Sequence, residues 1–549
     1  MDNLLPKPRG CPVTASSART QPTVRPPEMV QLASKPLNRR TVLKIGGVGA
    51  MAATLTSVGA TAWMPQRAQA ATAASFPDIQ FDIGAYVHPA QTIAGVLVDF
   101  GVLFTFLAPA GLTRNPTKSD QWTLAAALAT IESTYAFAPS GIFVFVAYGL
   151  SYFSRLPSGL VASSMPRLAS DQSRLVLEEA VPSPTDVSPL NPQISKLRFN
   201  VPVRIESNDV LFTLRSDSLA NIVDVSAWFN GSNTLNGSSV PSPDFNGLFS
   251  FKTPRLNFVR PGLPRQVAEV NNFSFQDQIN PASSMWMGFV DQQVAGSAPS
   301  GATVTFAGTP TAQLTTARAG DYFDNGAIQH LSHNIMDLAQ FYNTSAASPE
   351  TFSERVQYMF RSKTNDDTPG LPFPQDPNDP FTNGGGLGAP TGDLSVQQQS
   401  AVLPNLFFGA DDQATNFDPA VTDHSKYRVG HLTALQRSSR AADGTPLHIR
   451  NDGPGLSPQD VPDGSSQPTL EFTVFVPTAE FFRQMRVNSA SLDYVKAGEQ
   501  GGTAASVPPG VEAADAEDDG LERFLTATRR QNFLIPPRRN RSFPLLELT

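Results

Sequence analysis

Residues 141–148 read GIFVFVAY and carry the clearest strand signal in the chain. A short run of β-branched and aromatic residues between turn residues is typical of a buried strand. Working back along the chain, residues 121–135 carry a helical pattern, and residues 109–120 are a turn-rich break. The apolar run at 93–107 lies ahead of that break. The order predicted here is strand, helix, strand.

The chain downstream of this unit extends the same pattern. A Pro/Ser-rich loop at 155–192 leads into residues 208–215, whose buried and solvent-facing positions alternate as in a strand. Residues 218–229 then carry a helical pattern. A β-α-β-β-α order is the opening of a ferredoxin-like unit.

A polar stretch of Asn, Ser and Pro at 230–283 separates this block from a second one with the same element types. Its predicted strands lie at 285–290, 327–338 and 470–476, and its predicted helices at 349–361 and 478–487. We interpret the recurrence as a second ferredoxin-like half, which makes the fold class α+β with long loop insertions. Residues 364–424, rich in Pro, Gly, Asp and Asn, are expected to form a surface insertion, and 520–528 a terminal helix.

The N-terminal segment has the pattern of a twin-arginine export signal. Arg39 and Arg40 precede a weakly apolar stretch from Ile45 to Trp63, and Ala68-Gln69-Ala70 resembles a cleavage site. The alternative, a transmembrane anchor, is disfavoured by the many Gly, Ala and Thr residues. We therefore expect residues 1–70 to be a disordered N-terminus and signal peptide, and the mature protein to be periplasmic or extracellular. The halves are predicted at 71–283 and 284–549.

Composition narrows the function classes. The one cysteine, Cys11, lies in the segment expected to be removed, so thiol chemistry is excluded from the mature chain. A net charge of −8 without a basic block in the mature chain argues against nucleic acid. No later stretch is long and apolar enough to span a bilayer, so no stable membrane span is expected after cleavage.

The histidines form no common zinc motif, since HExxH does not occur. His330 and His333 fall three apart in a predicted strand and should face opposite sides, as packing or surface residues. No GxSxG or phosphate-binding glycine loop occurs either. Taken by themselves, His431 in an apolar setting is more often a core residue than a ligand, and Asp291 more often a turn or cap residue.

Seven short segments stand in colinear order along the chain, at 144–153, 208–214, 288–292, 428–431, 448–450, 469–475 and 524–537. Together they resemble the dye-decolourising peroxidase superfamily, haem proteins built as dimeric α+β barrels from two ferredoxin-like halves. One departure is Gln292, which stands where the family's distal loop has its closing glycine.

The resemblance implies a haem-dependent peroxidase, an oxidoreductase that uses hydrogen peroxide to oxidise organic donors by one-electron steps. It matches His431 to the proximal ligand of haem b iron, which leaves the opposite face of the haem open to peroxide. Asp291 would move a proton between the peroxide oxygens, and Arg450 would stabilise the negative charge that develops. The resemblance also implies a homo-oligomer. The alternative is an exported binding or structural protein that kept this fold without haem.

Overall fold

The computed structural model describes residues 76–87, 102–181, 198–260, 262–279, 284–287, 299–308, 314–342, 448–482 and 524–549, and the backbone of two short strands, β1 (Thr92–Ile93) and β2 (Val96–Leu97). The predicted signal, the predicted insertion at 364–424 and the predicted helix at 349–361 lie outside the described residues.

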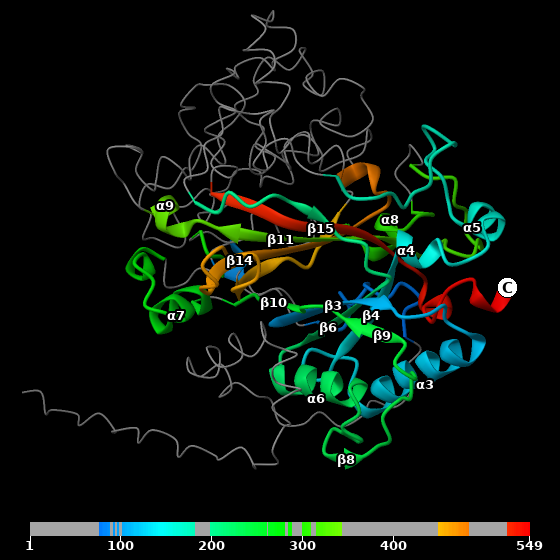
Figure 1. Ribbon diagram of the computed structural model, residues 1–549, viewed down its shortest axis with the longest axis horizontal. Coiled ribbons are helices and arrows are strands. Elements are labelled where there is room, and N and C mark those ends of the chain that lie inside the picture. The colour runs from blue at the N-terminus through cyan, green and yellow to red at the C-terminus, as the bar shows by residue number, and fades with distance from the viewer. Residues whose placement is uncertain are drawn as a thin grey trace, which may run out of the picture. The chain divides into compact units, whose positions relative to one another are not determined.

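The first half is a ferredoxin-like unit. Its main elements are β3 (Phe104–Leu112), α3 (Lys118–Thr134), β4 (Phe143–Gly149), β6 (Val210–Ser216), α6 (Leu219–Phe229), β9 (Phe249–Phe251) and β10 (Arg255–Phe258). The strands are hydrogen-bonded in the order β4-β6-β3-β9, with every pair antiparallel, and α3 and α6 lie together on one side of them (Figure 1). A short helix, α4 (Leu150–Phe153), follows β4, and α5 (Ser158–Ser164) lies in the stretch predicted to be a loop.

A capping box sets the start of α3. The Thr117 hydroxyl accepts a hydrogen bond from the Asp120 N–H (3.3 Å), and the Asp120 carboxylate accepts one from the Thr117 N–H (2.7 Å). Arg114 donates to both oxygens of the same carboxylate at 2.7 and 2.8 Å. The Arg114 hydrogen bonds, with those from Thr117, lower the pKa of Asp120 to about 2. The carboxylate therefore stays charged at the positive end of the helix dipole.

The fourth strand of this half lies in the stretch expected to be a polar interruption, so that expectation was wrong for residues 249–258. Phe251 pairs with Ala110, whereas Arg255 pairs with Leu107, so the β9–β10 side has one extra residue. This is a β-bulge at 252–254. Pro109 faces it and accepts the Lys252 N–H at 2.9 Å, which explains why a proline is tolerated inside β3.

The second half contains β11 (Ala327–Met336), α9 (Leu338–Tyr342), β12 (Ile449–Arg450), β13 (Gly453–Ser457), β14 (Gln467–Val476) and β15 (Leu525–Ile535), and residues 480–482 begin a helix. Its strand order, β13-β14-β11-β15, repeats the topology of the first half. The prediction of two ferredoxin-like halves is confirmed. Between α6 and this half lie the short strands β7 (Thr234–Leu235) and β8 (Ser238–Ser239) and the helix α7 (Leu263–Val270).

Two predicted elements of this half were wrong. The described part of the predicted strand at 285–290 is a turn, in which the Trp286 indole N–H donates to the Gly455 carbonyl at 3.0 Å. The second is the predicted helix at 520–528: from Leu525 onward these residues form β15, which pairs with β11 along nearly its whole length. Tertiary pairing overrides the helix-forming composition there.

The two sheets close on each other. β10 pairs with β13 through Asn257 and Gly455, and β15 pairs with β4 through Phe533 and Gly149. Since β10 also pairs with β3, the ring β4-β6-β3-β10-β13-β14-β11-β15 is continuous. Gly455 is required at this seam, because a Cβ atom there would lie 2.5 Å from Thr469 Oγ1 and 3.0 Å from the Leu256 carbonyl oxygen.

Alternation along the strands divides the side chains between a lumen and an outer face. The lumen holds an aromatic cluster in which Phe475 stacks on Phe81 at 4.5 Å and meets Phe145 edge-on at 6.2 Å. Polar side chains extend the lumen, and Gln329 donates to Thr213 (3.1 Å) and Thr473 (3.3 Å). The barrel is therefore a filled core and not a channel.

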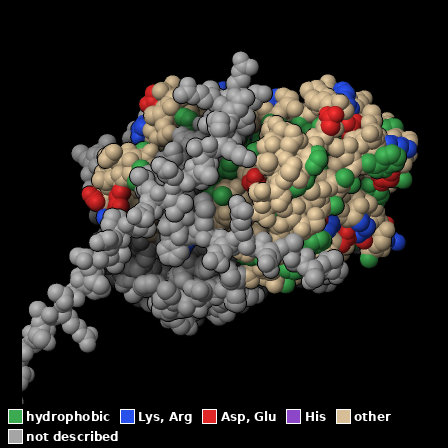
Figure 2. Space-filling view, turned by 90° about the horizontal axis from the view of Figure 1, so that it is seen from below, with side chains coloured by type: hydrophobic (Ala, Val, Ile, Leu, Met, Phe, Trp, Pro, Cys, Tyr) green, Lys and Arg blue, Asp and Glu red, His purple; other side chains and the backbone are tan. Residues whose placement is uncertain are grey.

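The surface is mixed in charge. On the face in Figure 2, acidic and basic side chains lie close together in small groups. None of the helices within the described ranges has both the length and the apolar character needed to cross a membrane.

Replacing Phe145 by Ala should lower the free energy of unfolding by about 3–5 kcal/mol, because the side chain is fully buried in the lumen. Replacing Trp122 by Ala, whose side chain is 71% exposed on α3, should change it by less than about 0.5 kcal/mol. Urea unfolding followed by circular dichroism measures both. Equal losses would contradict the assignment of Phe145 to the core.

Candidate functional site

Of the three predicted site residues, Arg450 lies in the described structure, and Asp291 and His431 lie outside it. Arg450 ends β12, whose pairing with β14 sets Ile449 opposite Phe475 and Arg450 opposite Val474. Ile449 packs against the lumen cluster. Because neighbouring strand residues face opposite sides, Arg450 lies on the outer face of the second half.

His330 shares that outer face. It pairs with the same Val474 from the other side, and its imidazole stacks on Phe482 with ring centroids 3.8 Å apart. The Asn532 amide donates to the Glu178 carbonyl at 2.9 Å, so its Oδ1 is turned toward His330 Nδ1 at 2.7 Å. This fixes the tautomer: Nδ1 carries the hydrogen of the neutral ring, and the lone pair lies on Nε2.

An aromatic wall and an ion pair border this face. The ring centroids of His448 and Phe481 lie 6.1 Å apart, and the Phe481 ring packs against the Phe482 ring. Arg174 forms ion pairs with Glu178 and with Glu480, where the helix after β14 begins. Hydrogen bonds and charges from the two glutamates raise the pKa of Arg174 above its ordinary value, although burial opposes the shift. The face thus combines apolar rings with fixed charges.

His333 faces the lumen, on the opposite side of β11 from His330, as expected from the sequence. Its Nδ1 lies 2.8 Å from one oxygen of Glu471 and 3.0 Å from the other, and its Nε2 lies 3.3 Å from the Gln459 carbonyl oxygen. Both ring nitrogens therefore face acceptors. Sequence analysis missed this pair, whose members are 138 positions apart but directly opposite in the β11–β14 register.

Next to this pair lies a network in which two buried carboxylates are shared by Arg529, Arg255 and, at 3.8 Å from Asp460, the exposed Arg204. Arg529 donates hydrogen bonds to the Asp460 carboxylate from Nε (2.6 Å) and Nη2 (2.7 Å), and to Glu206 from Nη1 (3.2 Å). Glu206 also pairs with the buried Arg255. Burial alone would raise the pKa of Asp460, but the Arg529 hydrogen bonds and charge outweigh burial and hold the pKa below its ordinary value. The described residues contain no group of three or more His, Cys, Asp or Glu suited to a metal ion.

Comparison with known proteins gives the following similarities. Residues 104–370 match the model of a family of unknown function, DUF7405. The search of curated proteins returned no match.

Three solved structures share a weak likeness to the chain. They are a putative DyP-type peroxidase from Shewanella oneidensis (12% identity, TM-score 0.39, covering 80% of this chain and 94% of that chain), the encapsulated DyP-type peroxidase from Mycobacterium smegmatis (13%, 0.39, 80% and 94%) and a dye-decolorizing protein from V. cholerae (12%, 0.37, 82% and 99%).

Replacing Asp460 by Asn should destabilise the protein by about 3 kcal/mol at pH 7, because it removes the buried carboxylate charge that Arg529 holds through Nε and Nη2 and leaves Glu206 as its remaining partner. The pKa of Asp460 is lowered by folding, so its contribution is present above the ordinary aspartate pKa and lost as the pH falls through the lowered value. The difference in unfolding free energy between wild type and variant should therefore shrink between pH 7 and pH 3.

Asp277→Asn is the matched control, because Asp277 also pairs with an arginine, Arg265 at 3.4 Å, but its side chain is 83% exposed. It should change stability by less than about 0.5 kcal/mol at either pH. If the difference in unfolding free energy between wild type and Asp460→Asn stays constant with pH, the Asp460 charge contributes nothing to stability.

Proposed function

We propose that the protein is an exported haem peroxidase that uses hydrogen peroxide to oxidise organic donors by single-electron steps. The observation that carries the proposal is the position of Arg450: the arginine matched by sequence resemblance lies on the outer face of the second ferredoxin-like half, away from the filled lumen. The closed barrel of two such halves, topologically the architecture implied by the resemblance, supports it.

The described residues of this face suit a haem. The rings of Phe481 and Phe482 offer an apolar wall for a flat macrocycle, with the His448 imidazole beside them, and Arg450 is a cation in partly buried surroundings. His431 is proposed as the axial ligand through its imidazole nitrogen. When bound, haem supplies the redox-active iron that passes electrons from the donor to peroxide.

The chain's own residues perform the proton and charge steps. We assign to Asp291 the movement of a proton between the two oxygens of hydrogen peroxide, so that one oxygen would leave as water when the O–O bond breaks, with the electrons supplied by the bound haem. Arg450 stabilises the negative charge on the oxygens during this transfer, and its guanidinium stays protonated at any working pH. Export through the twin-arginine pathway fits the proposal, because that pathway carries a chain that has folded around its cofactor.

Replacing His431 by Ala should remove the Soret absorbance of the haem-loaded protein, because the iron loses its proposed ligand. His424→Ala, a histidine seven positions earlier in the same segment, is the matched control and should keep the full absorbance. Absorbance spectra of the purified variants test this. Equal spectra for both variants would remove His431 from the proposed site.

Replacing Arg450 by Leu should slow peroxide-dependent oxidation of an organic donor by about 100-fold while haem remains bound. The measurement is the oxidation rate per bound haem, with thermal unfolding as a check on folding. Unchanged rates at full haem loading would refute the role of Arg450. A protein that stays colourless with excess haem would instead support the non-enzymatic alternative.

A further inference from the structure

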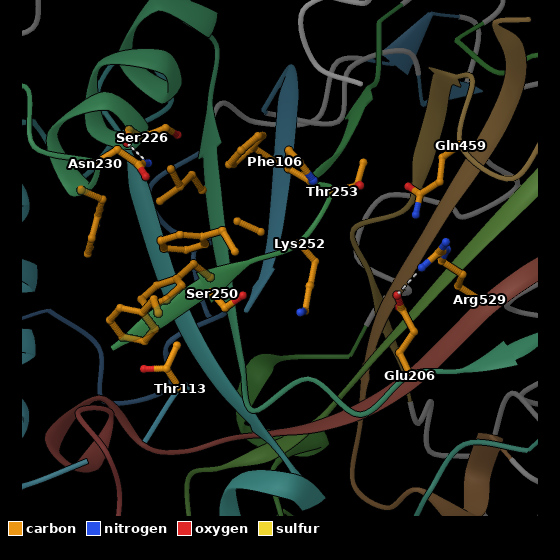
Figure 3. Close-up of a pocket in the computed structure, with 17 residues that line it drawn as sticks. Phe106, Thr113, Glu206, Ser226, Asn230, Ser250, Lys252, Thr253, Gln459 and Arg529 are labelled. Carbon is orange, nitrogen blue, oxygen red and sulfur yellow. Dashed lines mark hydrogen bonds and ion pairs between the residues drawn. The ribbon is translucent and has the colours of Figure 1, made fainter. Parts of the chain in front are cut away.

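A cavity of about 890 Å³ lies against the outer face of the first half, and Arg450, the described residue of the proposed haem site, is not among the residues that line it (Figure 3). Its apolar wall comes from alternate residues of paired strands. Phe106 and Ala108 of β3 pair with Leu214 and Phe212 of β6, all facing away from the lumen. Alternation along the two strands therefore sets these side chains against the cavity while their neighbours face the lumen.

Phenylalanine rings dominate this wall. The Phe212 ring lies 5.4 Å from Phe229 of α6, 5.4 Å from Phe249 and 6.0 Å from Phe251, at interplanar angles of 50°, 80° and 48°. The Phe251 side chain remains 37% exposed. Rings set at such angles offer both faces and edges, which suits a flat aromatic guest.

The other wall is polar and carries one excess positive charge. Figure 3 shows Lys252 between the Phe106–Ser250 side and the Glu206–Arg529 pair. Among the charged residues that line the cavity, Arg529 pairs with Glu206 at 3.2 Å, whereas Arg255, Asp460 and Arg204, which extend this network, do not line it. Within the part of the chain that the structure describes, no carboxylate forms an ion pair with Lys252, which leaves its ammonium group as the net charge of the cavity.

The bulge at 252–254 sets this lysine in place. Its backbone N–H is tied to the Pro109 carbonyl, and its exposed side chain extends from the point where β9 ends. We propose that the cavity binds an aromatic monoanion such as an aryl carboxylate, with the ring against the phenylalanines and the carboxylate paired with Lys252. This binding requires no haem and is independent of the proposed peroxidase activity.

Isothermal titration calorimetry of the full chain with 2-naphthoate, and with its neutral analogue 2-naphthalenemethanol, tests the proposal. Wild type should bind naphthoate more tightly than the alcohol. Lys252→Met should weaken naphthoate binding about fivefold, the change expected from losing a partly exposed ion pair, and leave binding of the alcohol within about twofold. Lys118→Met, which removes another exposed lysine, should alter neither affinity.

Ser226→Phe extends a large side chain from α6 into the cavity and should abolish binding of both probes. Thermal unfolding of every variant checks that the fold is kept. The proposal is overturned if wild type binds neither probe, if Ser226→Phe binds naphthoate normally, or if Lys252→Met weakens both probes equally.

Discussion

Continuous backbone pairing around the barrel is the constraint on which the rest of the structure depends. Closure removes the free sheet edges that each ferredoxin-like half would otherwise expose. It also fixes register at two seams, Asn257 with Gly455 and Phe533 with Gly149. A slip of one residue would exchange lumen and outer face along a whole strand. The side on which Arg450, His330 and His333 lie is therefore a consequence of closure.

In the described part of the chain the lumen is filled, which leaves the outer faces for binding a ligand. Aromatic rings occupy the middle of the lumen, and the polar groups around them have partners: His333 faces Glu471, and Arg529 pairs with Asp460 and Glu206. Arg215 donates hydrogen bonds to Thr105 and Asn451. Such ion pairs are costly to break but contribute modestly as a whole, because burial removes each charge from water. The same closure generates two different outer faces, one bearing Arg450 and one lined by phenylalanines around Lys252.

Sequence analysis predicted the elements whose local pattern agrees with their tertiary role. The runs at 141–148 and 208–215 are strands because their apolar content is buried on both faces. It failed where pairing decides the structure: residues 249–258 are rich in polar and turn residues yet complete a sheet, and 525–528 join β15 despite a helix-like composition. For the site, the order of the family-like segments predicted Arg450 as a functional residue. The side of the sheet on which Arg450 lies is decided by its pairing with Val474. The His333–Glu471 pair depends on a long-range register that no local pattern encodes.

We propose that the outer face of the second half holds a haem that the chain acquires before export. The absorbance spectrum of the natively exported wild-type protein tests this proposal, because it reports cofactor and site together. We expect a Soret band with haem stoichiometric to the chain, perturbed when peroxide is added. A folded, exported protein that remains colourless even when haem is supplied in excess during expression would refute the haem site.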